Sequence, residues 1–370
     1  MNMKIESVLF SPVTLDNLTL PNRIVMAPMT RSLSPNNIPT VEMLAYYKRR
    51  AEGGTGLIIS EGTFINHPVA NGYMDVPAFY GDALEMWEKI VKEVHASGAK
   101  MIPQIWHTGS IRPKGMSPNP DLLSIGPMDE FSDETKIVKA MDQQDIDDVI
   151  VAFTQAAMDA EKLGFDGVEI HGAHGYLIDQ FLWENTNQRT DKYGGSLKNR
   201  IRLASEIVSS IRKSVGKQFT IVFRFSQWKM MDYDAKIAKT PDELEVFLLA
   251  LVESGVDIFH VSQRRFWEPA FEDSDLSLAG WTKKITGKAV IAVGSIGMDK
   301  AIEVDMFEGK PVLTTPASLT LVEEKLQNKE FDLVAVGRAL LADPNWTKKM
   351  KNNQMDKVIP FNSDSLAILT

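Results

Sequence analysis

Eight short apolar runs, each followed by a longer amphipathic or loop segment, constrain the fold of this chain more than any other feature of its sequence. The runs are rich in Val and Ile and are too short to be helices, which is typical of parallel strands that are buried on both faces. They cover residues 23–28, 56–62, 101–106, 166–172, 219–226, 257–262, 289–294 and 331–337. We therefore expect parallel strands at these positions.

Helical patterns lie between the runs. In residues 80–98 the apolar side chains share one helical face, formed by Leu84, Trp87, Ile90, Val91 and Val94. Residues 145–164 repeat the pattern, and residues 240–255 open with Thr-Pro-Asp-Glu, a favourable helix start. The repeated alternation of strand and helix predicts an α/β protein with a single (β/α)₈ fold, the TIM barrel.

The remaining segments complete this prediction. Residues 10–22, "FSPVTLDNLTLPN", alternate around a turn, and we expect an N-terminal β-hairpin that closes the barrel floor. The longest irregular stretch, 109–143, follows the third strand, and a loop of this length is more often a functional lid than an accident. No linker rich in Pro, Gly and Ser divides the chain, so residues 1–370 are expected to form one domain, with a tail of about 355–370 that is left unassigned.

The composition limits the partners. The net charge of -9 argues against a broad surface for nucleic acid or for an anionic membrane, so any phosphate must be held at a local site. The absence of cysteine excludes disulfides, thiolate zinc sites, iron–sulfur clusters and a cysteine nucleophile. Residues 1–12 lack the apolar core of a signal peptide, and no run approaches the ~18 apolar residues of a membrane span. A cytoplasmic protein that binds small molecules is expected.

Polar residues and glycines stand at the C-terminal ends of the predicted strands, where barrel enzymes place their chemistry. They are Thr30, Gln104, His171, Arg224, Gly294, Gly337 and Arg338. A single polar residue at such a position often only caps a loop, but a whole rim of them favours a site.

Two glycine motifs predict a phosphate site within this rim. Residues 293–297, "VGSIG", and 336–340, "VGRAL", place glycine where a strand turns toward a helix, so backbone amides can approach an anion closely. Arg338 adds a guanidinium that can bind phosphate oxygens in a bidentate manner. Two ordinary tight turns are the alternative. No G-x-G-x-x-G follows a strand, so a dinucleotide held in the Rossmann manner is unsupported.

At this point the chain resembles the old yellow enzyme family, FMN-dependent NADH:flavin oxidoreductases and ene-reductases. The matching segments are "LPNRIVMAPMTR" (20–31), "PQIWHTG" (103–109), "AEKLGFDGVEIHGAHGYLIDQFLWENTNQRTDKYGGSLKNRIRL" (160–203), "FRFS" (223–226), "AVGSIG" (292–297) and "DLVAVGRALLADPNW" (332–346). The likeness covers about residues 8–350, and the stretch from Gly167 to Arg200 is its most specific part.

The resemblance implies a barrel that holds FMN over the strand ends. Thr30 would bond the flavin O4 region, Gln104 the pyrimidine edge, and Arg224 would lie near N1 and O2, where a cation tunes the flavin potential. The phosphate would be held by Gly294, Ser295, Gly337 and Arg338. Pro28, Met29 and Gly62 complete the implied cofactor-binding residues.

The resemblance also implies a reaction. NADH or NADPH would reduce the flavin, which would then reduce the C=C bond of an α,β-unsaturated carbonyl compound; quinones and nitro compounds are further possible acceptors. His171 and His174 would bind the carbonyl oxygen, and Tyr176 would be the proton donor. Thr30 stands where one branch of the family has Cys, and His174 stands where other members have Asn. The nicotinamide preference and the choice between monomer and homo-oligomer stay open.

The histidine pair in "HGAHGY" (171–176) has other interpretations. A metal-dependent barrel lyase or hydrolase would use His171 and His174, but a zinc site needs a third protein ligand, and only Glu169, His107 and His260 are candidates. A purely structural pair and a non-catalytic flavin-binding protein are further alternatives. Two imidazole donors aimed at one substrate oxygen are the preferred hypothesis. Four aromatic residues follow strands and could either stack on the flavin or substrate or pack under loops: Trp106, Trp228, Phe266 and Trp267.

Overall fold

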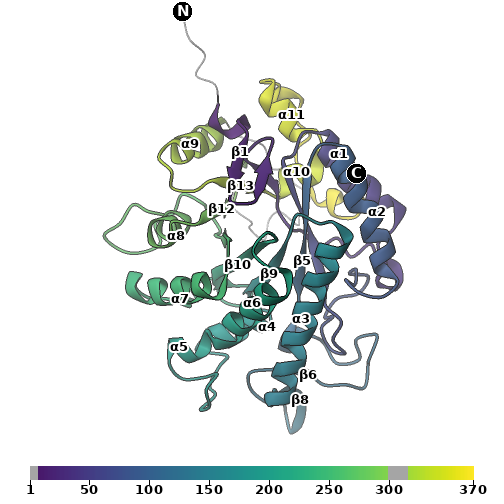
Figure 1. Cartoon of the computed structure of the whole chain (residues 1–370), viewed down its shortest axis with the longest axis vertical. Helices are drawn as coiled ribbons and strands as arrows, with labels where there is room; N and C mark the ends of the chain where they lie inside the picture. Colours follow the sequence, from purple (N-terminus) through teal and green to yellow (C-terminus); the bar gives the residue numbers. More distant parts are fainter. Residues whose placement is uncertain (1–6, 299–315) are drawn as a thin grey trace, which may run out of the picture.

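A closed barrel of parallel strands forms the centre of the structure, a computed structural model that describes residues 7–298 and 316–370 (Figure 1). The barrel strands are β3 (Ile24–Met26), β4 (Leu57–Phe64), β5 (Lys100–Trp106), β9 (Gly167–His174), β10 (Thr220–Lys229), β11 (Ile258–Ser262), β12 (Ala289–Val293) and β13 (Leu333–Val336). The barrel closes because β13 pairs with β3 and β9 pairs with both β5 and β10. The predicted TIM barrel is confirmed, with each strand inside its predicted run or extending it by a few residues.

Helices surround the barrel (Figure 1). The longer ones are α1 (Val41–Glu52), α2 (Ala83–Ala96), α3 (Gln143–Leu163), α6 (Arg202–Val215), α7 (Pro241–Ser254), α8 (Leu278–Thr286) and α9 (Pro316–Gln327); shorter ones are α4 (Leu177–Leu182), α5 (Leu197–Arg200), α10 (Arg338–Ala342) and α11 (Trp346–Lys351). Local signals set their ends: Asp142 caps α3 in a capping box, and Gly164 ends it at φ 87°. None of the helices in the described ranges has the length and apolarity to cross a membrane.

The N-terminal hairpin closes the barrel, as predicted. Strands β1 (Val13–Leu15) and β2 (Leu18–Leu20) pair in an antiparallel manner. Leu18 and Leu20 belong to the same apolar cluster as the inward-facing side chains of the barrel strands, such as Val222 and Leu333. Apolar residues therefore fill the end of the barrel interior that the hairpin closes.

The long segment after β5 is more ordered than the irregular loop that the sequence predicted. It contains a small sheet of β6 (Ser124–Gly126), β8 (Thr135–Ala140) and β7 (Glu130–Ser132), with β8 in the middle. In Figure 1, β6 and β8 project below the barrel beside α3.

The C-terminal tail, which the sequence left unassigned, returns to the barrel. After the short helices η5 (Met355–Lys357) and η6 (Ser363–Leu366), it crosses the segment that follows β3. The Nη2 of Arg31 donates to the carbonyl oxygens of Ser365, Leu366 and Ile368, at 3.1, 3.1 and 2.8 Å. The tail is therefore tied to the loop that precedes α1.

Candidate active site

A cavity of about 230 Å³ opens at the C-terminal ends of the barrel strands, where β3, β10, β11, β12 and β13 end. Most of the residues predicted to bind the cofactor line it: Pro28, Met29, Arg224, Gly294, Ser295, Gly337 and Arg338. Three do not. Thr30 is exposed, Gly62 packs under the indole of Trp106, and Gln104 is buried in the barrel interior.

The loop after β12 has the backbone that its glycine motif predicted. Gly294 adopts φ 143°, and a Cβ there would lie 2.4 Å from the carbonyl oxygen of Gln263. Ser295 follows at φ 57° and donates its hydroxyl to the carbonyl of Arg264 at 2.9 Å. No side chain fits at position 294, so the backbone itself forms this wall of the cavity.

Arg224 provides a buried cation on the cavity floor. Its side chain is 6% exposed, its Nε has no hydrogen-bond partner, and it forms no ion pair with any carboxylate of residues 7–298 and 316–370. Burial lowers the pKa of Arg224, but the nearby charge of Glu169 opposes that effect. A buried guanidinium without a direct counter-charge suits a ligand atom that carries negative charge.

A second polar layer lies below Arg224, inside the barrel. The carboxylate of Glu169, which is 0% exposed, accepts from Nε2 of Gln104 at 2.7 Å and lies 2.6 Å from Nδ1 of His260. Glu169 therefore fixes which way the Gln104 amide points, with its oxygen away from the carboxylate. The sequence analysis considered Glu169 and His260 only as metal ligands. Strand parity could have found this layer, because residues 104, 169, 224 and 260 all point inward.

The two histidines of the central motif come together at the end of β9. The ring centroids of His171 and His174 are 5.3 Å apart and the rings are perpendicular. Nδ1 of His171 is buried without a partner, and Nε2 of His174 lies 2.8 Å from the hydroxyl of Ser262. Burial, aided by the charge of Arg224, lowers the pKa of both imidazoles well below the ordinary value. At neutral pH this favours the neutral form of both rings, in which each ring carries one N–H.

Tyr176 completes this group and has a partner that the sequence analysis missed. Its ring centroid lies 5.0 Å from that of His171, and its hydroxyl is 3.0 Å from the hydroxyl of Tyr73. Burial raises the pKa of Tyr176 well above its ordinary value, so the hydroxyl keeps its proton at neutral pH. Tyr73 comes from the irregular segment after β4, where no periodic pattern marks a residue as part of a site.

The four aromatic residues left open by the sequence divide into two pairs. Trp106 stacks on His171, with centroids 5.9 Å apart, and Trp228 stacks on His174 at 4.4 Å. Phe266 is fully buried against Phe331, and Trp267 packs edge-on against it. Trp106 and Trp228 thus belong to the site.

This geometry does not support a metal site at His171 and His174. No group of three His, Cys, Asp or Glu side chains within residues 7–298 and 316–370 is arranged to hold a metal ion. His174 faces Ser262 rather than a carboxylate, and Glu169 faces His260.

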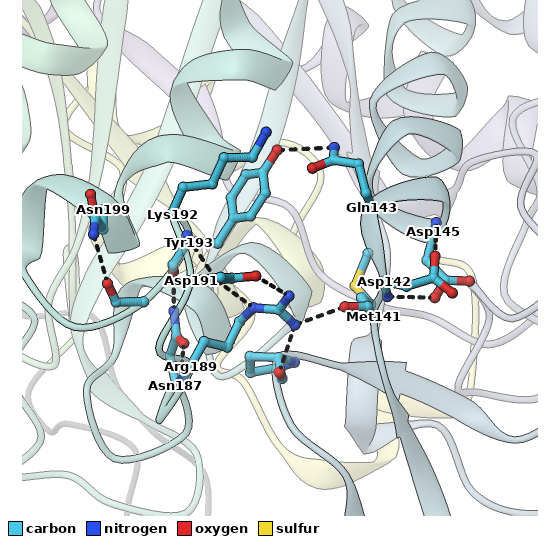
Figure 2. A network of polar contacts seen from close by, with 12 residues as sticks. Met141, Asp142, Gln143, Asp145, Asn187, Arg189, Asp191, Lys192, Tyr193 and Asn199 are labelled. Atoms are coloured by element: carbon cyan, nitrogen blue, oxygen red, sulfur yellow. Dashed lines mark hydrogen bonds and ion pairs between the residues drawn. The ribbon is translucent and has the colours of Figure 1, made fainter.

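Part of the most specific motif of the sequence serves the scaffold instead of the site (Figure 2). Nη1 of Arg189 donates to the carbonyl oxygens of Pro127 and Met141, at 3.0 and 2.8 Å, and its Nη2 pairs with Asp191 at 2.5 Å. Asn187 donates to the carbonyl of Tyr193 at 2.7 Å. The segment after α4 therefore holds the chain just after β6 and just after β8, on either side of the stretch that contains β7 and β8.

Comparison with known proteins agrees with the fold. The model of the NADH:flavin oxidoreductase / NADH oxidase family matches residues 8–357. The chain is 32% identical to a putative 12-oxophytodienoate reductase-like protein of Arabidopsis thaliana, over 91% of this chain and 98% of that protein. It is 32% identical to an NADH oxidase of Thermoanaerobacter brockii over 95% of this chain, but spans only 52% of that protein.

The likeness extends to solved structures. Morphinone reductase in complex with tetrahydroNAD superposes with a TM-score of 0.79 at 26% identity, covering 97% of this chain and 93% of that one. Old Yellow Enzyme from Pichia sp. AKU4542 gives a TM-score of 0.81 at 25% identity, covering 98% and 90%. The chain spans 56% of a putative 12-oxophytodienoate reductase of rice, Oryza sativa subsp. japonica, in a match at 40% identity that also covers 56% of this chain.

Proposed function

The chain belongs to the NADH:flavin oxidoreductase / NADH oxidase family, the family of the old yellow enzymes, and on that premise we propose that it is an NAD(P)H-dependent ene-reductase. FMN is the cofactor of this family. The substrate would be an electron-poor alkene, such as an α,β-unsaturated carbonyl compound. The observation that carries the proposal is the pair of imidazoles beside the ring of Tyr176, next to a cavity lined by the buried guanidinium of Arg224.

The cavity residues fit FMN. Arg224 would face the pyrimidine of the flavin, where its charge stabilises the reduced, anionic form. The backbone wall at Gly294 and Ser295, with Gly337 and Arg338 opposite, would hold the phosphate. Gln104 would present its amide oxygen to the flavin because Glu169 occupies its nitrogen. We also propose Thr30 and Gly62 as FMN-binding residues, although neither lines the cavity.

When bound, FMN supplies the hydride chemistry between the nicotinamide and the alkene. His171 and His174 would donate hydrogen bonds to the carbonyl oxygen, and these bonds strengthen as charge develops on that oxygen. Tyr176 would give its proton to the α-carbon, which is basic enough to take it from a neutral phenol. Trp106 and Trp228, which stack on the two imidazoles, would help to exclude water from them.

Relatives support the substrate class. Proteins named 12-oxophytodienoate reductase and morphinone reductase are among them, and both names describe reductases of small molecules. We propose that quinones and nitro compounds are further acceptors. We also propose that residues 1–370 form one FMN-binding domain of a cytoplasmic protein, as monomer or homo-oligomer, without nucleic-acid or membrane partners.

Anaerobic spectroscopy of the purified protein tests the proposal. NADH or NADPH should bleach the absorbance of bound FMN, and a simple enone should restore it while the saturated ketone forms. A flavin that stays oxidised with both nucleotides would favour the non-catalytic flavin-binding alternative. A colourless protein with bound metal would favour the metal-dependent barrel enzyme.

A further inference from the structure

A fully buried ion pair lies behind the turn that carries His174. Nζ of Lys229 is 2.7 Å from Oδ1 of Asp179, and both side chains are 0% exposed. The proposed chemistry uses neither charge. Because the desolvation of two charges offsets most of their attraction, such a pair is weak evidence for stability alone.

The carboxylate of the pair holds the turn directly. Oδ2 of Asp179 accepts the N–H of Gly175 at 2.7 Å. His174 and Gly175 have φ 64° and φ 87°, so two consecutive residues lie in the left-handed region. A histidine in that region persists only where its surroundings hold it. Asp179 supplies one of these contacts from the first turn of α4.

The ammonium of the pair ties the same turn to the end of β10. Nζ of Lys229 also donates to the carbonyl of Ser226 at 3.2 Å, and the hydroxyl of Ser226 accepts the N–H of His174 at 3.1 Å. Lys229 is the register partner of His174 beyond an irregularity in the β9–β10 pairing. The Ser-Gln-Trp-Lys end of β10 (226–229) therefore contacts His174 by a hydrogen bond from its backbone N–H and by stacking through Trp228. Through the ion pair it also reaches Asp179, which accepts the N–H of Gly175.

We propose that Lys229 and Asp179 are positioning residues of the two-histidine site. They hold the left-handed turn through which β9 passes into α4, and that turn sets where the His174 imidazole and the Tyr176 hydroxyl lie relative to His171. The inference deepens the proposed function and rests on it, because the ligand that feels the positioning is the oxygen bound by the histidines.

Two double variants separate positioning from folding. Lys229→Met with Asp179→Asn removes both charges but keeps an amide oxygen that can accept the Gly175 N–H. Lys229→Met with Asp179→Leu also removes both charges, fills the space with apolar groups and leaves that N–H without its acceptor. Neither variant buries an unpaired charge. Lys283→Met is the matched control, because it removes a lysine that pairs with Asp332 at 2.8 Å away from the cavity.

The measurement is the affinity of each FMN-loaded protein for phenol, detected through the change that bound phenol causes in the flavin absorbance. We expect the Lys283→Met control to bind phenol like the wild type. The Met/Asn variant loses the Lys229 contacts but keeps an acceptor for the Gly175 N–H, so it should bind phenol about threefold more weakly. The Met/Leu variant should keep FMN but bind phenol about tenfold more weakly, a difference of about 1.4 kcal/mol, and its reduced flavin should be reoxidised more slowly by an enone.

Two results would overturn the inference. Wild-type phenol affinity in the Met/Leu variant would mean that the pair serves folding alone. Equal losses in the Met/Asn and Met/Leu variants would mean that the bond to Gly175 is not what matters. A wild-type holoprotein that binds no phenol would instead contradict the proposed function, because it would show that the histidine pair does not bind a ligand oxygen.

Discussion

The hydroxyl of Tyr73 lies 3.0 Å from the hydroxyl of Tyr176, and the two residues are 103 positions apart in the chain. Tyr73 also stacks on Trp106, with ring centroids 5.6 Å apart, and Trp106 stacks on His171. The proton donor proposed for the alkene is therefore held by a second phenol that is itself fixed by the aromatic packing of the site.

This contact predicts the effect of Tyr73→Phe. When Tyr176 gives up its proton, the hydroxyl of Tyr73 can donate to the phenolate that is left in a buried position. Hydrogen bonds to charged groups contribute ~1.5–3 kcal/mol, so reoxidation of the reduced flavin by an enone should slow by at least about tenfold. Rapid-mixing measurements of both half-reactions test this. Equal slowing of flavin reduction by NADPH would contradict it.

Arg224 and Glu169 should shift the flavin potential in opposite directions. Arg224→Met removes the cation beside the flavin, so the midpoint potential should become more negative. Glu169→Gln removes the anion of the layer below, so the potential should become more positive, each by roughly 1–2 kcal/mol of reduced-state stability. Reductive titration against reference dyes measures both. Shifts of the same sign in the two variants would argue against this charge arrangement.

Glu61 should make stability depend on pH. Its Oε2 accepts the N–H of Arg31 at 3.0 Å, and its Oε1 has no partner. Burial raises the pKa of Glu61 from 4.5 to about 7, although the hydrogen bond from the Arg31 backbone opposes this. The folded state therefore binds the Glu61 proton more tightly than the unfolded state does. The contribution of this proton to the free energy of unfolding is complete below pH 4.5 and is lost as the pH rises through 7.

Glu61→Gln removes this dependence. It keeps an oxygen for the Arg31 N–H and carries no charge, so the free energy of unfolding should rise by about 2–3 kcal/mol at pH 8 and change little at pH 5. Urea unfolding of the FMN-saturated protein at the two pH values measures the difference. The same change at both pH values would mean that Glu61 does not titrate in this range.

Arg189→Met should loosen the small sheet without touching the site. The variant loses the hydrogen bonds to the carbonyls of Pro127 and Met141, the second of which Figure 2 shows. Bonds of this kind contribute ~1.5–3 kcal/mol. Amide exchange in residues 124–140 should therefore accelerate, while FMN binding and phenol affinity stay unchanged. Loss of FMN in this variant would show that the segment takes part in the cofactor site.

The barrel could be predicted because its strands are almost wholly buried and so appear as short, mostly apolar runs. The small sheet could not, because β7 has only exposed residues and no apolar pattern. His171, His174 and Arg224 could be placed at one rim because parallel strands end on one side. Tyr73 and the Lys229–Asp179 pair could not be placed, because their partners are distant in sequence and a buried charge leaves no periodic signal.

Tyr176→Phe tests the central claim most directly, because it removes one oxygen and leaves the ring in place. General acids of this kind contribute about 10²–10⁴-fold. Flavin reduction by NAD(P)H should change little, reoxidation by a simple enone should slow by up to that factor, and reoxidation by a quinone, which needs no carbon protonation, should be spared. Equal slowing with enone and quinone, or no slowing with either, would contradict the assignment of Tyr176 as the proton donor of an ene-reductase.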